Sequence, residues 1–315
     1  MIKYLYTILK STNPRLFYHK MLLMITIVMV VYYLYKFSAP PKEASVEGFS
    51  QEVPFVLKTD LAIYDDFYAE VYDGITEREK TCQKELYEIV KMTELDTKNS
   101  TILDIGSGTG CTVSELSRSG YNAYGIDKSE SMIAFSETKY PDGQFIRGDV
   151  TDTMAFEKGL FTHILCTNFT IYEMPDKRLF FRNCYHWLKP NGYLVIHLAD
   201  REKFSAKQFS DGVMDLGALY RSIMPPKKER KVTATVEFAD YVYESVYEVK
   251  TENVVLKETF TDKETKHIRQ NENTLRMSPI DDILKIAASS GFIIQGKTGC
   301  AGDENQFLYV LERTM

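Results

Sequence analysis

A short apolar strand that ends in an acid and opens into three alternating glycines is the strongest constraint on the fold of this chain. The strand covers residues 102–105 and contains Asp104, and Gly106, Gly108 and Gly110 follow it. Glycine tolerates positive φ angles and lets a ligand approach the backbone closely. Several nucleotide-like cofactors bind such strand-to-helix turns, so the residues that follow decide between them.

Strands and helices alternate regularly around this turn. The pattern predicts strands at 101–105, 122–127, 144–147, 161–167 and 193–199, with helices at 111–119, 129–139 and 176–188. Two helices, at about 64–72 and 76–95, precede them. This spacing predicts a doubly wound, Rossmann-like α/β fold whose mainly parallel sheet has helices on both faces.

The regular alternation of strands and helices stops after residue 200. Between about 232 and 277, apolar residues alternate with polar ones. Alternation with period two predicts antiparallel strands with one wet face, so we expect a β insert at about 200–278, after the fifth strand. A helix at 279–290 and strands at 292–294 and 307–312 then complete the domain.

The N-terminal segment has a different character. Residues 21–35 carry no charge, and lysines and tyrosines flank the run. We expect residues 1–37 to include a single transmembrane helix at about 16–37, with a cleaved signal peptide as the main alternative. Pro, Ser, Glu and Gly without periodicity predict a linker at 38–58, followed by the catalytic domain at 59–315.

Three acids follow the predicted parallel strands in turn: Asp104, Asp127 and Asp149. Ligands of such sheets bind at the carboxyl ends of the strands, where these acids lie. A carboxylate about 20 residues past the glycines suits the two hydroxyls of a ribose. The alternative, that these acids only cap helices, is plausible for Asp127, which stands two residues before Ser129.

Two cofactors compete for this loop. A dinucleotide fingerprint has glycines spaced G-x-G-x-x-G and faces a pyrophosphate, whereas this loop is one residue shorter and Asp104 would repel a phosphate. S-adenosylmethionine (SAM) carries an ammonium and a sulfonium and no phosphate, so an acid there favours it. Asp149 can accept a hydrogen bond from an adenine amino group. The residues therefore favour SAM.

The stretch 101–199 resembles the class I SAM-dependent methyltransferases through its segments ILDIGSGTG, YGIDKSESM, IRGDV and NCYHWLKPNGYLVIHLAD. The helix near Tyr64 and the β insert resemble the lid and insert of the small-molecule branch, which includes sugar-amine N-methyltransferases. The resemblance implies that the following residues bind the cofactor: Asp104, Gly106, Ser107, Gly108 and Gly110 at the methionine end; Asp127, Lys128 and Met132 at the ribose and adenine; Asp149 and Val150 at the base; Thr167 and Asn168 at the reacting centre; and Tyr64 and Tyr68, with Tyr72, in the lid.

Methyl transfer needs positioning and exclusion of water, and it needs a base only when the acceptor must lose a proton. The candidates for such a role are His197, near the end of the fifth strand, and Tyr172, with Glu173 beside it. His197 stands among apolar residues, so a structural role in the core is its alternative reading. No cluster of metal ligands is expected.

The acceptor is left open between a small molecule, a lipid head group and a protein. The net charge of −6 and the sequence Thr167-Asn168-Phe169-Thr170 after the fourth strand disfavour a nucleic acid. The five cysteines show no metal-ligand spacing and suggest no disulfide framework, which favours a reducing compartment. The insert can also form an interface between copies of the chain.

Orientation in the membrane is a point of conflict. More lysines and arginines precede the apolar run than follow it, which places the C-terminal domain outside the cytosol. SAM is a cytosolic metabolite, however, and Asn168-Phe169-Thr170 is a glycosylation sequon at the predicted site. We therefore expect a single-pass membrane protein with a cytosol-facing domain. The functional alternatives are a membrane scaffold that binds SAM without turnover and a nicotinamide-dependent oxidoreductase.

Overall fold

The computed structural model describes residues 20–21, 24–26, 28–29, 53–203, 230–250, 253–300 and 303–315. The chain divides into two units, residues 1–47 and 48–315. The seven described residues of the first unit are helical, and the rest of the predicted transmembrane helix at 16–37 lies outside the described residues. None of the described helices is long and apolar enough to cross a bilayer.

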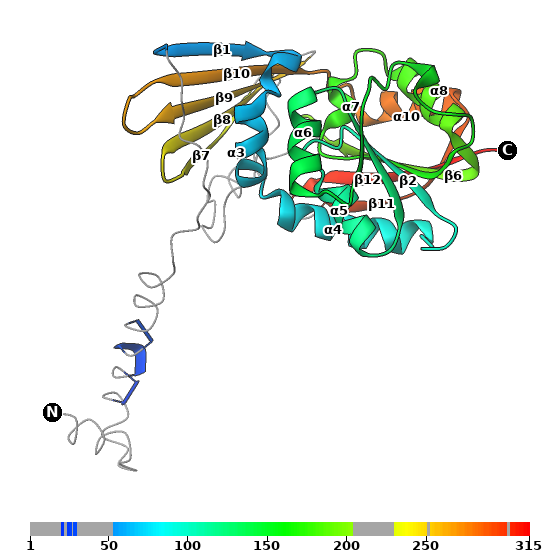
Figure 1. The fold of residues 1–315 in the computed structure, drawn as a ribbon, viewed down its shortest axis with the longest axis horizontal. Coiled ribbons are helices and arrows are strands. Elements are labelled where there is room, and N and C mark those ends of the chain that lie inside the picture. The colour runs from blue at the N-terminus through cyan, green and yellow to red at the C-terminus, as the bar shows by residue number, and fades with distance from the viewer. Residues whose placement is uncertain are drawn as a thin grey trace. The chain divides into compact units, whose positions relative to one another are not determined.

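The centre of the second unit is a seven-stranded sheet with the order β11-β12-β6-β5-β2-β3-β4 (Figure 1). The five strands from β6 to β4 are parallel, and β12 runs antiparallel to both β6 and β11. In chain order the strands are β2 (Thr101–Ile105), β3 (Asn122–Asp127), β4 (Gln144–Arg147), β5 (Phe161–Cys166), β6 (Leu188–Ala199), β11 (Phe292–Cys300) and β12 (Asp303–Arg313). The predicted doubly wound α/β fold is confirmed, with a mixed sheet edge.

Helices cover both faces of this sheet because successive residues of its buried strands point in opposite directions. Ile102 packs in one core with α4 and α5, whereas Leu103 packs in the other core with α8 and α10. The helices are α3 (Asp66–Thr76), α4 (Arg78–Thr93), α5 (Cys111–Arg118), α6 (Glu130–Lys139), α7 (Thr170–Glu173), α8 (Lys177–Trp187) and α10 (Ile280–Ser289), with 3₁₀ turns η2 (Asp60–Ile63) and η3 (Thr153–Ala155).

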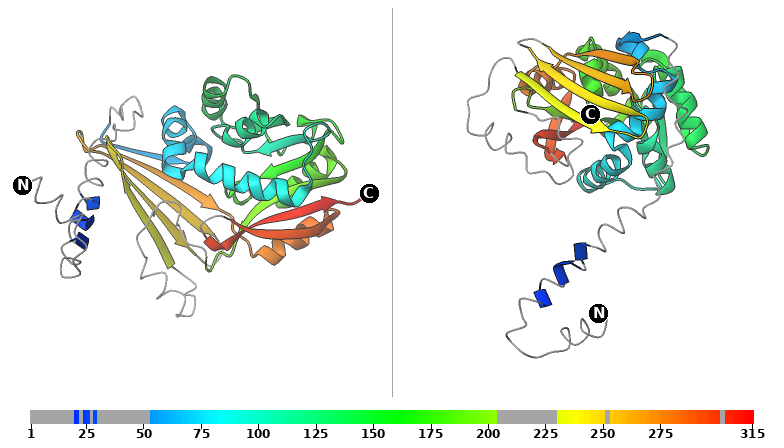
Figure 2. Two further views of the ribbon diagram at one scale, coloured as in Figure 1. Left: turned by 90° about the horizontal axis from the view of Figure 1, so that it is seen from below. Right: turned by 90° about the vertical axis from the view of Figure 1, so that its left-hand side faces the viewer.

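A second sheet of five strands, ordered β1-β10-β9-β8-β7, projects from one end of the α/β layers (Figure 2, left). Its strands are β1 (Phe55–Thr59), β7 (Arg230–Glu237), β8 (Tyr241–Val249), β9 (Val254–Asp262) and β10 (Ile268–Leu275). Strands β7 to β10 pair antiparallel, as predicted for the insert, and residues 204–229 of that insert lie outside the described residues. The predicted linker is corrected at its end, because residues 55–58 form most of β1 and pair with β10.

Helix α3 lies between the second sheet and the α/β layers (Figure 1). Its N-cap is Asp65, whose carboxylate accepts a hydrogen bond from the backbone N–H of Tyr68. Arg269 of β10 donates to the same carboxylate at 2.9 Å and to the backbone carbonyl of Ile63. The ring of Phe67 packs edge-on against Phe260 of β9. The second sheet therefore fixes the start of α3, and with it the aromatic residues next to the glycine loop.

Candidate functional site

A cavity of about 440 Å³ lies at the carboxyl ends of β2 and β3, within the range of roughly 300–1,000 Å³ that is typical of small-molecule sites. Its wall combines the glycine loop, the ends of the central strands, the start of the lid and the end of the second sheet. The lining residues are Asp60, Leu61, Tyr64, Tyr72, Ile105, Gly106, Gly108, Ile126, Asp127, Lys128, Met132, Gly148, Asp149, Val150, Thr151, Asn168, Thr170, Glu173, Met174, Pro175, Asn273 and Arg276.

The three glycines of the loop all have positive φ angles, but they face different neighbours. Gly106 and Gly108 line the cavity. Gly110, at φ +86°, faces the interior instead, where a Cβ would lie 2.7 Å from Cζ of Phe145. Gly110 and the buried Ser107 do not form the wall, and their contact with the cofactor stays a prediction.

Hydrogen bonds within the protein already use most backbone N–H groups of the loop. Those of Gly106 and Ser107 donate to the carbonyl of Ile126, and that of Gly110 donates to the carbonyl of Ser107. The N–H of Gly108 donates to Oδ2 of Asp127 at 2.9 Å. A pyrophosphate needs such N–H groups unpaired and would meet the Asp127 carboxylate here. The loop therefore suits a cationic ligand such as SAM.

Asp127 lies at the end of β3 with both carboxylate oxygens held in place. Oδ2 accepts from Gly108, and Oδ1 accepts from the N–H of Ser129 at 2.9 Å. Burial raises the pKa of Asp127 above its ordinary value, although these backbone hydrogen bonds oppose the change. The position is that of the predicted ribose ligand, and Met132 and Val150 line the cavity beside it.

Asp149, the predicted partner of the base, forms an ion pair with Lys128 at 2.8 Å. Burial acts to raise the pKa of Asp149, but the hydrogen bonds from Lys128 and Thr151 outweigh it and lower the pKa. Both partners line the cavity. An adenine amino group would therefore approach a carboxylate that is ionised at neutral pH.

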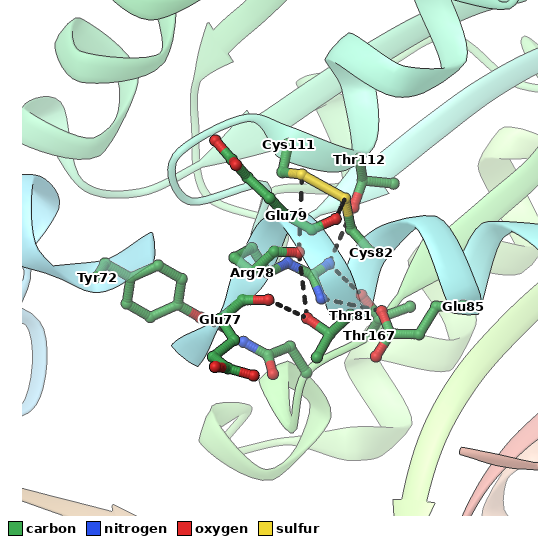
Figure 3. Close-up of polar contacts among 11 residues, drawn as sticks. Tyr72, Glu77, Arg78, Glu79, Thr81, Cys82, Glu85, Cys111, Thr112 and Thr167 are labelled. Atoms are coloured by element: carbon green, nitrogen blue, oxygen red, sulfur yellow. Dashed lines mark hydrogen bonds and ion pairs between the residues drawn. A yellow bond between two sulfur atoms is a disulfide. The ribbon is translucent and has the colours of Figure 1, made fainter. Parts of the chain in front are cut away.

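Asp104 is buried behind the loop and does not line the cavity, so its contact with the methionine end stays a prediction. Burial raises its pKa to about 7, although the nearby Arg78 guanidinium opposes this change. Arg78, the first residue of α4, donates to Glu85 and to Oγ1 of Thr112 at 2.9 Å each, and to Oγ1 of Thr167 at 3.4 Å (Figure 3). Thr167 likewise lies off the cavity wall.

A disulfide joins Cys82 of α4 to Cys111 at the start of α5, next to Arg78 (Figure 3). The sequence spacing suggested no disulfide, and that prediction was wrong. The two cysteines are 29 residues apart. Packing of α4 against α5 brings them together, and no local spacing rule reports that contact.

Two of the three predicted lid tyrosines line the cavity. Tyr64 and Tyr72 form part of the wall, and the side-chain amide of Asn168 donates to the hydroxyl of Tyr72. Asn168 has a φ of +51°, an uncommon conformation for a non-glycine residue. Tyr68 is turned away: its hydroxyl donates to Oε1 of Glu258 in the second sheet at 2.9 Å.

Neither predicted catalytic side chain lies on the cavity wall. His197 of β6 is buried, and its ring stacks on Phe169 with centroids 4.6 Å apart. Tyr172 is fully buried, and its hydroxyl accepts from the N–H of Ala199 at 2.8 Å. The structure therefore places both side chains in the core, which favours a structural role for each, and the catalytic assignments stay predictions.

Glu173, next to Tyr172, also lines the cavity. Its Oε1 accepts from the Tyr64 hydroxyl at 2.5 Å and from the amide of Asn273 at 3.0 Å. Burial raises the pKa of Glu173 to about 6, and the two hydrogen bonds limit the increase. No sequence pattern indicated a role for Asn273, which lies 100 residues away on β10. Alternation along β10 places it on the inner face, but only the tertiary contact relates it to Glu173.

Comparison with known proteins finds a similar domain and a similar fold. Residues 103–196 match the family model described as a methyltransferase domain. The putative methyltransferase YqeM of Bacillus subtilis is 27% identical over 130 residues, which are 38% of this chain and 53% of that protein. The chain spans between half and two thirds of the length of the first curated relatives that it matches.

Solved structures share the fold over most of the chain. A SAM-dependent methyltransferase from Clostridium acetobutylicum has a TM-score of 0.58 at 16% identity, over 79% of this chain and 98% of that one. SAM-bound CalS10, an amino pentose methyltransferase from Micromonospora echinaspora, has a TM-score of 0.54 at 17% identity, over 78% and 97%. Residues 103–196 are therefore similar to a methyltransferase domain, and the second unit has the fold of solved SAM-dependent methyltransferases.

Proposed function

We propose that the protein transfers the methyl group of SAM to a small-molecule acceptor bound in the same cavity. One observation carries this proposal: a single cavity contains Asp127 at the glycine loop and Glu173 at the end of the second sheet. The first carboxylate suits the ribose of the cofactor. The second lies where residues of the lid and of the insert meet and faces the remaining space.

The residues of the wall fit SAM. Asp127 would accept hydrogen bonds from the ribose hydroxyls, Met132 and Val150 would pack on the adenine, and Asp149 would accept from its amino group. When bound, SAM supplies an electrophilic methyl on a positively charged sulfur. Tyr64 and Tyr72 exclude water and present aromatic faces that tolerate positive charge.

A small acceptor is the best match because the start of the lid and the end of the second sheet contribute to the cavity wall, and its volume of about 440 Å³ suits a cofactor with a compact substrate. CalS10 is described as acting on an amino pentose, which is a substrate of that size class. A lipid head group or a protein side chain remain the other acceptors to test.

Calorimetry with SAM, S-adenosylhomocysteine and NAD tests the cofactor, and transfer of tritiated methyl to a metabolite extract tests turnover. We expect both SAM and S-adenosylhomocysteine to bind, NAD not to bind, and tritium to enter a small molecule. S-adenosylhomocysteine binding without any methyl transfer would support a non-catalytic SAM-binding scaffold instead. NAD binding alone would support an oxidoreductase.

We further propose that the uncharged run at 21–35 anchors the protein in a membrane and that the second unit faces the cytosol, although the Cys82–Cys111 disulfide by itself favours an oxidising compartment. Asn168 of the sequon lies on the cavity wall and bonds to Tyr72, where a glycan would not fit. Carbonate extraction tests the anchor, and release into the supernatant would refute it. Protease protection in sealed vesicles tests the orientation. The second sheet is the surface proposed for pairing with another copy.

A further inference from the structure

The acceptor end of the cavity contains a carboxylate, that of Glu173. Glu173 receives hydrogen bonds from two neutral groups, the Tyr64 hydroxyl and the Asn273 amide, and from no cation among the described residues. The other acids whose charges reach it, Asp127 and Glu258, add to the negative potential. Keeping a half-buried carboxylate ionised beside these acids costs free energy unless a positively charged group binds to it.

The carboxylate is also oriented for a further partner. Both hydrogen bonds go to Oε1, and Oε2 receives none from the residues that the structure describes. Glu173 lines the cavity, so this oxygen is available to a donor that enters it. The rings of Tyr64 and Tyr72 lie on the same wall, and aromatic faces attract cations.

We propose that Glu173 binds the ammonium group of a small amine and takes a proton from it, so that the methyl acceptor is an amine nitrogen. This inference rests on the proposed function and names its substrate class. An ammonium proton passes to Oε2 of Glu173, and the lone pair of the nitrogen forms the new C–N bond. The C–S bond breaks with its electron pair on sulfur, and the carboxyl proton leaves to water.

The charges favour an amine over a hydroxyl acceptor. Amines and phenols both have pKa values of about 10, so proton affinity alone does not separate them. An ammonium, however, is attracted by Glu173 and Asp127, and burial lowers its pKa toward that of the carboxylate. A phenolate would be repelled by Asp127 and Glu258. An aliphatic alcohol is too weak an acid for a carboxyl whose pKa is about 6.

Other titratable groups around Glu173 do not change this assignment. Tyr64 and Tyr72 of the lid have pKa values raised by burial and stay neutral at physiological pH. Arg276, which follows β10, lines the cavity but is exposed. The amino group of Lys177 on α8 donates to the carbonyls of Met174 and Arg276.

Direct retention of metabolites tests the inference without turnover. The full chain, saturated with S-adenosylhomocysteine, is mixed with a small-molecule extract of the organism that carries the gene. Retained compounds other than S-adenosylhomocysteine, which carries an amine itself, are then labelled with phenyl isothiocyanate, which reacts with primary and secondary amines, and identified by mass spectrometry. We expect the wild type to retain an amine and Glu173→Gln to retain at least tenfold less. Retention of compounds without an amine, equal retention by Glu173→Gln, or no retention would overturn the inference.

The matched control is Glu272→Gln. Glu272 precedes Asn273 on β10, and its carboxylate accepts from Gln270 and lies near Lys257 rather than in the cavity. This variant should retain the amine as the wild type does. Binding of S-adenosylhomocysteine, measured by calorimetry, should stay within about threefold for both variants. If the wild type does not bind S-adenosylhomocysteine, the proposed function is refuted. If it binds S-adenosylhomocysteine but retains no amine, only the amine assignment fails.

A second experiment uses transfer of tritiated methyl and chemical blocking. The extract is treated with acetic anhydride, which acylates amines, and then with hydroxylamine, which restores phenols but not amides. We expect blocking to remove at least nine tenths of the tritium incorporation. Incorporation that persists would refute an amine acceptor while leaving the methyltransferase proposal intact.

Discussion

Removing the Tyr64 hydroxyl should raise the pKa of Glu173. This hydroxyl donates to Oε1 at 2.5 Å and stabilises the ionised carboxylate, so its loss favours the protonated form. A hydrogen bond to a charged group contributes about 1.5–3 kcal/mol, and 1.36 kcal/mol corresponds to one pKa unit. Water that enters the space left by the hydroxyl restores part of the lost stabilisation of the ionised carboxylate. We therefore expect Tyr64→Phe to move the pKa of Glu173 from about 6 to about 7.

The assay is a pH titration of ¹³C-carboxyl-labelled glutamate by NMR, with the Glu173 signal assigned from its absence in Glu173→Gln. Tyr68→Phe is the control, because the Tyr68 hydroxyl donates to Glu258 instead. That variant should leave the pKa of Glu173 unchanged. A pKa that falls or does not move in Tyr64→Phe would show that the hydroxyl does not stabilise the carboxylate.

The raised pKa of Glu173 also has a consequence for stability. Burial lifts its folded-state pKa from the ordinary 4.5 to about 6. The protonated form is therefore favoured by the fold, and the contribution of this group is fully present below pH 4.5 and lost as the pH rises through about 6. Glu173→Gln should flatten this part of a urea-denaturation pH profile, and an unchanged slope would contradict the assignment.

Three further predictions concern binding and stability. Asp127→Asn should weaken S-adenosylhomocysteine binding by about 10- to 100-fold in calorimetry, since it removes charge-assisted hydrogen bonds worth about 1.5–3 kcal/mol, and wild-type affinity would exclude the ribose role. Gly110→Ala, at φ +86° and with its Cβ 2.7 Å from a phenyl ring, should lower the free energy of unfolding by about 2–4 kcal/mol, whereas Gly299→Ala, which has open space, should cost far less. Reduction of Cys82–Cys111, a separation of 29 residues, should lower stability by about 3–4 kcal/mol, and a reductant should not affect the Cys82→Ser/Cys111→Ser variant.

The local pattern was sufficient for the central sheet and for one side of the cavity. Strands β2, β3 and β4 have the predicted bounds because each is a short apolar run between turn residues. Asp127 reaches the wall because it ends a parallel strand, and ligands meet such sheets at that edge. Asp104 beside the glycines also indicated SAM as the cofactor, as did a glycine loop one residue shorter than the dinucleotide fingerprint.

Sequence patterns predicted less well which side chains face the cavity, because the position of a residue along a strand does not determine what surrounds its side chain. Asp104 and Asp127 both lie near strand ends, yet Asp104 is buried against Arg78 and only Asp127 faces the cavity. His197 and Tyr172 have chemically suitable side chains in a suitable region, but packing against Phe169 and Ala199 removes them from the wall. Side-chain direction at a strand end depends on what packs behind it, which the sequence does not state.

By itself, the sequence determined the parallel sheet and the glycine loop and predicted the cofactor class, because these follow from periodicity and from residue chemistry over short spans. Only the tertiary structure decided which acid faces the acceptor. Tyr64, Glu173 and Asn273 come from the lid, from α7 and from the second sheet, and the hydrogen bonds that join them span about a hundred residues or more. Contacts between segments so far apart form through packing of the two sheets around α3, and no local spacing in the chain reports them.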